Sequence, residues 1–470
     1  MEIDKNSERP IYLQIYDNII DEIKNGYLIS GDRLLSRRKL SEKLSVSSQS
    51  VENAYQKLIA DGYIFSKAGS GYYVTTDRFW DEDHKIMKSR IYNFSTNGVE
   101  TSKLPFQTWS KLLRITIKED KGLFQHGDKA GEWSLRKSIR RLLFRTQGIK
   151  CKTEQIIIGP GYEDLLREIF NLFGMEKNVI MNNYYNYRAR EAAIYSRSNI
   201  KYITNDENGP FLDELNQFSD GVLYQEPTHD LPMAVTLSIE KRKAIIDWLN
   251  SGSGKYVIED ASDNDFQYGK NEKTLWELSG GKNVIYLGNF SMTIAPSMKI
   301  GYIVAPDEFV KWWFKKKTFY LNRVSRIEQV TLSKFIDLGY YEKHIKYMCD
   351  IYEEKTKVVI DAVKKSKLSE KTKIFGYTAG MYCNMSFDIS LDEEEAREIC
   401  LQNRIKISSL TTCIEDKKRA TLPPNTYNIG YGDLTNTQIR DGINLLASIW
   451  KKYLNWLKNR FGYYMARRFL

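Results

Sequence analysis

Hydrophobic residues near the start of the chain recur at helical spacing in three segments. Isoleucines mark one helix face over residues 10–25, and Gly26 follows where that helix would end. A short helix is predicted over residues 37–44, with Ser36 or a neighbour as its N-cap. A longer helix is predicted over residues 47–61, with its apolar positions on one face.

Two short extended patterns follow these helices, separated by a glycine-containing turn. Residues 63–65 and 71–74 are rich in Tyr, Ile, Phe and Val, and the turn between them runs from Lys67 through Gly69 to Ser70. This pattern predicts a β-hairpin. The order helix, helix, turn, helix, hairpin is typical of a winged helix-turn-helix.

From about Asn93 onward, short apolar runs alternate with helical patterns. This alternation predicts an α/β domain whose doubly wound, mostly parallel sheet has helices on both faces. Helical patterns then run from Glu308 to Lys367, and a final α+β segment follows. The strand candidates are 156–158, 179–181, 222–224, 256–258, 284–287 and 301–305.

The patterns divide the chain into five parts. We predict a winged helix-turn-helix over 1–76, a linker over 77–92, a large domain over 93–340, a small C-terminal subdomain over 341–450 and a basic aromatic tail over 451–470.

Composition supports a folded protein of several domains. The chain has 470 residues, of which 42% are hydrophobic, enough for two or three domains with sizeable cores. Its first residues lack the apolar core of a signal peptide, and no segment reaches the ~18–20 apolar residues of a spanning helix. We therefore predict a cytoplasmic protein with no membrane partner. The five cysteines and four histidines are dispersed, which indicates reduced thiols and no metal site.

The formal net charge of +10 is unevenly distributed. Residues 1–76 hold ten Lys or Arg and ten Asp or Glu, so the predicted winged helix is neutral overall. Residues 451–470 hold six Lys or Arg and no acid. That tail is either a helix that contacts DNA phosphates or an acidic partner, or a solvated amphipathic helix. Charge alone therefore does not establish DNA binding.

The stretch from Leu34 to Ile64 resembles the DNA-binding domain of GntR-type regulators. The resemblance implies double-stranded operator DNA as a partner, because small polar groups at the start of a recognition helix reach phosphates and base edges. A winged helix used only for protein contact, with Arg37 and Arg38 on a solvated face, is the alternative. The candidate DNA-binding residues are Ser36, Arg37, Arg38, Ser47, Ser48, Gln49, Ser50, Asn53, Lys67, Gly69 and Ser70.

Three residues depart from the GntR pattern. Relatives usually carry arginine where Ser48 stands, and often a basic or apolar residue where Glu52 stands. Leu35 replaces a usual proline. These departures predict a modest affinity or an unusual base preference.

Landmarks in the rest of the chain resemble aminotransferase-type pyridoxal phosphate (PLP) enzymes of fold type I. Together with the winged helix, they resemble MocR-type regulators of the GntR superfamily. This resemblance implies a homodimer with an aminotransferase-like domain. The landmarks are Phe106–Trp109, His126–Gly131 with Leu135 and Arg136, Ile158–Gly161, Pro227–His229, Ile258–Asp260, Tyr286–Tyr302 and Asn428–Tyr431.

The resemblance also implies the residues of a cofactor or effector pocket. Gly161 and Tyr162 match the helix start that presents amides to the PLP phosphate, where Ser291 and Lys299 match a hydroxyl and an arginine. Asp260 matches the partner of the pyridinium nitrogen, although it could simply end a strand. The remaining candidates are Arg188, which matches a retained arginine, His229, which is either packed or a ligand contact, and Met292.

Five positions differ from what catalysis in the family requires. Met292 stands where the Schiff-base lysine belongs, and a thioether cannot form an aldimine. Asn428 replaces the arginine that grips a substrate carboxylate. The other three positions are Ser262, Asn186 and His126, each in place of a tyrosine.

These substitutions favour a DNA-binding transcriptional regulator over an enzyme. In this hypothesis the aminotransferase-like domain is a dimer scaffold that senses an anionic or phosphorylated effector without transaminase chemistry, and no residue is catalytic. PLP is either bound non-covalently or not bound at all. The alternatives are a PLP-dependent aminotransferase-type enzyme, with Lys299 as a conceivable replacement amine, and a purely structural or interaction protein.

Overall fold

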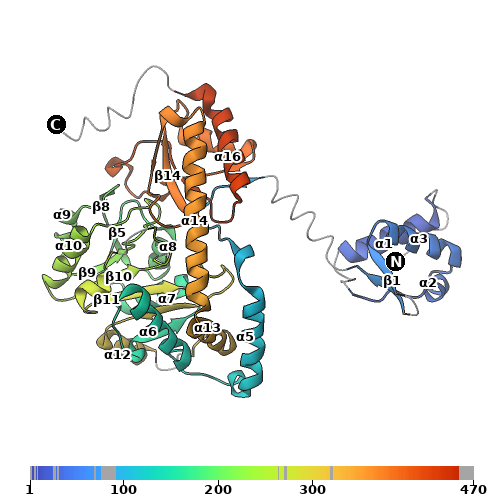
Figure 1. The fold of residues 1–470 in the computed structure, drawn as a ribbon, viewed down its shortest axis with the longest axis horizontal. Coiled ribbons are helices and arrows are strands. Elements are labelled where there is room, and N and C mark those ends of the chain that lie inside the picture. The colour runs from blue at the N-terminus through green and yellow to red at the C-terminus, as the bar shows by residue number, and fades with distance from the viewer. Residues whose placement is uncertain are drawn as a thin grey trace. The chain divides into compact units, whose positions relative to one another are not determined.

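The computed structural model describes residues 3–4, 7, 9–24, 28, 31–67, 70–75, 91–262, 264–268, 272–317 and 321–454. The predictions for Gly69, for most of the linker and for the tail beyond residue 454 lie outside these residues. By internal contacts the chain divides into two compact units, residues 1–91 and 92–470 (Figure 1).

The first unit is a winged helix-turn-helix, which confirms that prediction. One buried cluster joins its three helices and its hairpin, because each helix turns an apolar face inward. Tyr55 packs edge-on against Tyr72 of the hairpin, with ring centroids 4.7 Å apart. The elements are α1 (Ile11–Lys24), α2 (Arg37–Leu44), α3 (Ser48–Ala60), β1 (Ile64–Lys67) and β2 (Gly71–Val74).

The second unit is built on a seven-stranded sheet of order β4-β12-β11-β10-β9-β5-β6. β12 pairs antiparallel with both of its neighbours, and the other pairs are parallel, so the predicted mostly parallel sheet is confirmed. The strands are β4 (Ile156–Gly159), β5 (Asn178–Asn182), β6 (Asn199–Ile203), β9 (Gly221–Gln225), β10 (Lys255–Asp260), β11 (Val284–Asn289) and β12 (Gly301–Val304).

Sequence analysis missed β6 because it is an edge strand. Its alternation of exposed and partly buried positions breaks the continuous apolar run that marked the inner strands. Helices cover both faces of the sheet (Figure 1). Ile156 and Ile158 belong to one buried cluster, and Ile157 between them belongs to another. This division follows from the period of two along a strand.

Many helices of the second unit alternate with its strands along the chain. α14 is the longest of those that the structure describes, and it runs from the large-domain core at Tyr341 to the C-terminal core at Val359 (Figure 1). The helices are α5 (Phe106–Glu119), α6 (Trp133–Gln147), α7 (Tyr162–Phe173), α8 (Tyr187–Tyr195), α9 (Leu212–Leu215), α10 (Ile239–Asn250), α11 (Leu275–Ser279), α12 (Asp307–Lys316), α13 (Arg326–Asp337), α14 (Tyr340–Lys365), α15 (Glu393–Gln402) and α16 (Asn436–Trp450).

A smaller antiparallel sheet forms the C-terminal subdomain, in agreement with the predicted α+β segment. Its strand order is β13-β14-β17-β16. A separate short strand, β3 (Tyr92–Asn93), pairs in parallel with β15 (Ile405–Lys406), and Phe94 is buried in the core of this subdomain. The remaining strands are β13 (Thr372–Phe375), β14 (Tyr382–Phe387), β16 (Ser408–Ser409) and β17 (Thr426–Gly430).

The pairing of β3 places the start of the second unit against its C-terminal end. Sequence analysis assigned Tyr92 to the linker and Asn93 to the large domain. Local pattern did not reveal the pairing, because the partner strand lies far along the chain.

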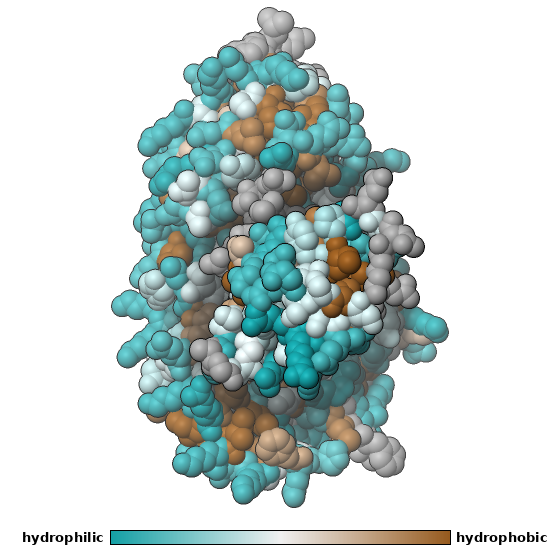
Figure 2. Space-filling model, turned by 90° about the vertical axis from the view of Figure 1, so that its right-hand side faces the viewer, coloured by the Kyte–Doolittle hydropathy of each residue, from teal (hydrophilic) through white to brown (hydrophobic). Residues whose placement is uncertain are grey.

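The surface view in Figure 2 is mostly hydrophilic, with hydrophobic residues in separate groups. Within the described ranges, no helix is both long and apolar enough to cross a membrane. In the same ranges, no three His, Cys, Asp or Glu side chains lie together as possible metal ligands.

Candidate functional site

The start of α3 presents small polar side chains to solvent. Ser47 is the N-cap, and its hydroxyl oxygen accepts from the Ser50 amide at 3.1 Å. Val51, Ala54, Tyr55 and Leu58 point inward, which leaves Ser48, Gln49 and Asn53 on the exposed side. The Gln49 amide donates to the Asn53 side-chain oxygen at 3.0 Å.

Both arginines at the start of α2 are ion-paired. Arg37 pairs with Glu52 of α3, and Arg38 pairs with Glu42 one turn further along α2 at 2.9 Å. Ser36 caps α2, because its hydroxyl oxygen accepts from the Lys39 amide at 3.3 Å. The cap role predicted for Ser36 is confirmed.

The hairpin brings further candidates together. Lys67 is exposed at the end of β1, and the Ser70 and Tyr73 hydroxyls lie 2.6 Å apart. Sequence analysis missed Arg33, whose guanidinium lies beside Gly71 of the wing, with Nε 3.3 Å from where a Cβ at that glycine would be. Arg33 stands between two helices, where no periodic pattern indicates a partner.

The second candidate site begins at the amino end of α7. Gly161 is its N-cap, with a left-handed φ of 95°, and no side chain caps this end. The aliphatic stem of Lys299 lies against Gly161, with carbon atoms 3.7–3.8 Å from where a Cβ would be. Uncapped amides, the helix dipole and a neighbouring lysine together favour an anion. The Ser291 hydroxyl donates to the Met298 carbonyl at 2.7 Å.

Asp260 ends β10 within a dense set of hydrogen bonds. It accepts from the Tyr224 hydroxyl at 2.5 Å, the Ser262 amide at 3.0 Å and the Ser262 hydroxyl at 2.6 Å. The Tyr162 hydroxyl lies 2.8 Å from that of Tyr224. Burial raises the pKa of Asp260 above its ordinary value and raises those of both tyrosines well above theirs.

Asn186 and Arg188 form another part of the site. The Asn186 side-chain oxygen caps α8 by accepting from the Arg188 amide at 2.9 Å, and its amide group donates to Glu226 at 2.9 Å. The Arg188 guanidinium donates to the Asn97 side-chain oxygen at 2.5 Å and to the Tyr187 hydroxyl at 3.2 Å. Asn97 belongs to the segment that follows β3.

These residues border a partly open cavity of about 40 Å³. Four of the predicted pocket residues line it: Tyr162, Arg188, Asp260 and Met292. Gly161, His229, Ser291 and Lys299 are not part of its lining. Asn186 and Ser262, two of the positions that differ from the catalytic pattern, also line the cavity. The lining residues that sequence analysis did not name are Thr96, Asn97, Glu226, Leu231 and Tyr382.

The residues present fit only part of PLP. The amino end of α7 suits a phosphate, but the cavity beside Asp260 is far below the ~300 Å³ or more of typical small-molecule pockets. The Asp260 carboxylate, which would face a pyridine ring, already accepts hydrogen bonds from the Tyr224 and Ser262 hydroxyls. The ring end therefore does not fit the cofactor as the side chains stand.

The positions that depart from the catalytic pattern have structural partners. Met292 borders a buried apolar cluster that includes Phe266, Met348 and Tyr352. Asn428 is buried and donates to the Pro232 carbonyl at 2.7 Å and the Asn384 side chain at 2.6 Å.

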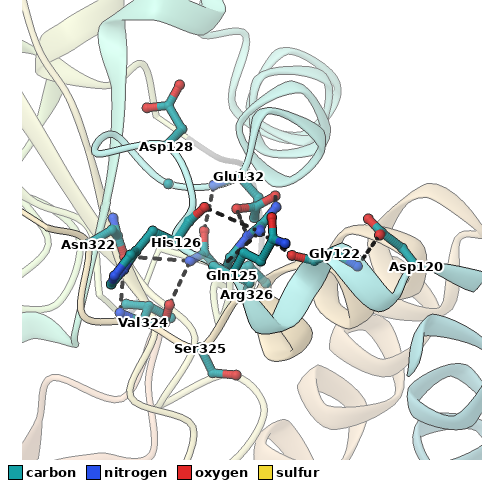
Figure 3. Close-up of polar contacts among 12 residues, drawn as sticks. Asp120, Gly122, Gln125, His126, Asp128, Glu132, Asn322, Val324, Ser325 and Arg326 are labelled. Atoms are coloured by element: carbon teal, nitrogen blue, oxygen red, sulfur yellow. Dashed lines mark hydrogen bonds and ion pairs between the residues drawn. The ribbon is translucent and has the colours of Figure 1, made fainter. Parts of the chain in front are cut away.

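Two histidines, His229 and His126, are not part of the cavity lining. His229 is buried with its ring centroid 4.3 Å from that of Tyr382, which favours the packed alternative. His126 is exposed on the loop before α6 (Figure 3). Arg326 holds that loop through an ion pair with Glu132 at 2.7 Å and a hydrogen bond to the Gly122 carbonyl at 2.7 Å.

Comparison with known proteins agrees with this geometry. The family model "Bacterial regulatory proteins, gntR family" matches residues 11–74, which span α1 to β2. The chain is 28% identical to the uncharacterized HTH-type transcriptional regulator YdeL of Bacillus subtilis (strain 168), over 96% of this chain and 98% of that protein. It is 23% identical to the probable rhizopine catabolism regulatory protein MocR of Rhizobium meliloti, over 95% of each chain. The chain is a MocR-type regulator.

The second unit of this MocR-type chain has the aminotransferase fold. The kynurenine aminotransferase of Pyrococcus horikoshii superposes with a TM-score of 0.69, at 21% identity, over 80% of this chain and 95% of that chain. At this identity the likeness concerns the fold alone. It confirms the predicted fold type I architecture. Whether the protein has an activity must be argued from the residues of the site.

Proposed function

We propose that this MocR-type regulator binds operator DNA through its winged helix and senses an anionic or phosphorylated small molecule through its aminotransferase-like unit. The protein acts as a homodimer and performs no transaminase chemistry. Its DNA-contacting residues are the exposed polar and basic side chains at the starts of α2 and α3 and on the wing.

One observation carries the link between effector and DNA. The chain that leaves the linker forms β3 and then lines the cavity with Thr96 and Asn97. Backbone hydrogen bonds fix this segment to the C-terminal subdomain, including Phe94 to the Lys406 carbonyl at 2.9 Å and Gly430 to the Phe94 carbonyl at 2.8 Å. Arg188, by contrast, lies on α8 of the large domain.

The Arg188–Asn97 hydrogen bond therefore joins two parts of the second unit across the cavity. An anion that binds Arg188 would compete with Asn97 for the guanidinium, so the ligand has different affinities for the two arrangements. Only such differential affinity can shift a conformational equilibrium. Because the segment continues into the linker, that shift reaches the winged helix.

Three features support the absence of transaminase chemistry. Met292 has no amine, the Asp260 carboxylate is occupied by Tyr224 and Ser262, and the cavity is about 40 Å³. A phosphate at the start of α7 is compatible with all three features. Non-covalent PLP, pyridoxamine phosphate or another phosphorylated compound would reach the rest of the site only after Arg188 or Asn186 moves.

The test measures DNA binding by the full chain. Fluorescence anisotropy is followed with the duplex upstream of its own gene at about 150 mM salt, because specific binding is distinguished at physiological ionic strength. PLP, pyridoxamine phosphate and inorganic phosphate are added separately. We expect saturable binding to that duplex and a change in affinity of about fivefold or more with at least one of these compounds.

Arg188→Ala should abolish the ligand response and keep DNA binding. Arg167→Ala is the matched control, since Arg167 is a partly exposed arginine on α7 whose ion pair with Asp164 lies outside the cavity lining. Amino acid turnover with added PLP, accompanied by an aldimine absorption band, would contradict the proposal and favour the enzyme alternative.

A further inference from the structure

The ion pair between Arg37 and Glu52 joins the two helices of the helix-turn-helix. Arg37 is the first residue of α2, and Glu52 is the fifth residue of α3. Both side chains remain accessible, with 45% and 31% of their surfaces exposed. They therefore form part of the surface that the helix-turn-helix turns outward.

A carboxylate on this surface needs an explanation. In helix-turn-helix proteins the second helix enters the major groove with its N-terminal residues at the base edges, and DNA phosphates repel a lone carboxylate. Within the described first unit, the first two turns of α3 contain Glu52 and no Lys or Arg. Glu52 therefore adds no affinity for the backbone, and its neutralisation by Arg37 makes its position tolerable.

The major-groove edge of a G·C pair has a matching arrangement of groups. Guanine presents the acceptors N7 and O6, and cytosine beside it presents the N4 amino donor. Arginine donates to the guanine acceptors, and glutamate accepts from cytosine N4. An ion-paired arginine and glutamate offer donors and an acceptor side by side, which is complementary to that edge.

We propose that Arg37 and Glu52 act as one unit that reads a G·C base pair in each operator half-site. Glu52 holds the guanidinium in place and selects cytosine, and Arg37 selects guanine. Because the pair carries no net charge, it contributes to discrimination between sequences more than to general attraction for DNA. The inference rests on the proposed DNA binding and specifies what that binding recognises.

Glu42 provides a matched comparison. It is also an acid paired with an arginine of α2, but its partner Arg38 is on the same helix and both side chains are more exposed, at 62% and 89%. The Arg38–Glu42 pair does not reach α3. Replacing Glu42 with glutamine changes the net charge of the winged helix-turn-helix by the same amount as replacing Glu52 with glutamine.

The experiment uses the full chain and a pool of random duplexes. Bound duplexes are selected through repeated rounds at about 150 mM salt for the wild type, Glu52→Gln, Glu42→Gln and Arg37→Lys. The wild type and Glu42→Gln should enrich sites with a fixed G·C pair in each half. Glu52→Gln and Arg37→Lys should enrich sites in which that position is relaxed, since lysine keeps the charge and loses the fork geometry.

Affinities on the selected site then give the size of the effect. Replacing the G·C pair with A·T should weaken wild-type binding by about tenfold or more and weaken Glu52→Gln binding by less than about threefold. Circular dichroism melting of each variant establishes that it is folded. An unchanged G·C preference in Glu52→Gln would overturn the inference, as would a uniform gain in affinity for all duplexes. If the wild type enriches no sequence, the DNA-binding function itself fails.

Discussion

At the scale of single residues, Met292 belongs both to the cavity lining and to the edge of a buried cluster. Its side chain lines the cavity and also borders an apolar cluster with Phe266, Met348 and Tyr352. A lysine at this position would bring a charged amine to the edge of that apolar cluster, and burying a charge is costly. An apolar residue is therefore more favourable than a lysine at position 292.

Met292→Lys should consequently not restore an enzyme. We expect no amino transfer from amino acids to 2-oxo acids with added PLP, because the cavity has no room for the ring and Arg188 is already bound to Asn97. Unfolding free energy should fall by about 2 kcal/mol or more. Met175→Lys, at a position 62% exposed, is the control and should leave stability nearly unchanged. Turnover by Met292→Lys would contradict this prediction.

Glu259 is a second residue whose role depends on burial. It is fully buried, and its two oxygens accept from the Leu275 and Trp276 amides, each at 2.8 Å, at the start of α11. Burial raises the pKa of Glu259 to about 7, although the two amide hydrogen bonds act to lower it. Burial likewise raises the pKa of Asp230 to about 7.

The pH dependence follows from these raised values. The folded state binds protons that the unfolded state has released above about pH 4.5, so the unfolding free energy falls as pH rises from there to about 7. Glu259→Gln should flatten that slope and cost about 1–3 kcal/mol through imperfect pairing of the amides. Urea denaturation at pH 5, 6 and 7.5 measures both effects. Glu277→Gln changes a more exposed acid within α11 and should keep the wild-type slope.

At the scale of elements, glycines allow the segment after β3 to lie against β17 and the turn beyond it. A Cβ at Gly430 would meet the Ser95 carbonyl, and a Cβ at Gly432 would meet the Gly98 carbonyl. Backbone atoms cannot move aside as a flexible side chain can. These glycines therefore fix the position of Thr96 and Asn97 at the cavity.

Gly432→Ala should push this segment away from the C-terminal subdomain. We expect a loss of about 1–3 kcal/mol in unfolding free energy, as overpacking typically produces, together with a weaker effect of ligand on DNA binding. Denaturation and the anisotropy titration provide the two measurements. Gly252→Ala, where a Cβ would make only ordinary contacts of 3.6 Å or more, should behave as the wild type. Equal loss in both variants would contradict this role.

At the scale of the whole molecule, three phenylalanines within one stretch of the chain are exposed to solvent. Phe106, Phe124 and Phe144 are 59%, 72% and 57% exposed and belong to α5, the turn after it and α6. Exposed apolar side chains can mark protein interfaces. We propose that they contribute to the homodimer.

Phe124→Asp should therefore weaken dimerisation, because a desolvated carboxylate without a partner is unfavourable at an interface. Sedimentation velocity at micromolar concentration should show a dimer for the wild type and a shift toward monomer for the variant. Met175→Asp changes a similarly exposed apolar residue outside that stretch and should remain dimeric. A monomeric wild type, or equal behaviour of the two variants, would count against this interface.

Much of the architecture could be predicted from the sequence because it rests on local pattern. The helices of the first unit and the inner strands of the second follow from the spacing of apolar residues, and Ser36 follows from the preference of helix starts for hydroxyl side chains. The edge strand β6 and the short strand β3 were missed. Their residues are only partly apolar, and a distant partner or a single neighbour decides their pairing.

The sequence by itself determined the two kinds of unit and the identity of the side chain at position 292. Periodicity and residue chemistry are properties of neighbours along the chain, so they need no tertiary information. The tertiary structure alone decided that Arg37 pairs with Glu52, that Asn97 meets Arg188 and that Tyr224 occupies Asp260. Those contacts join residues from separate elements, and their distances depend on how the whole chain packs.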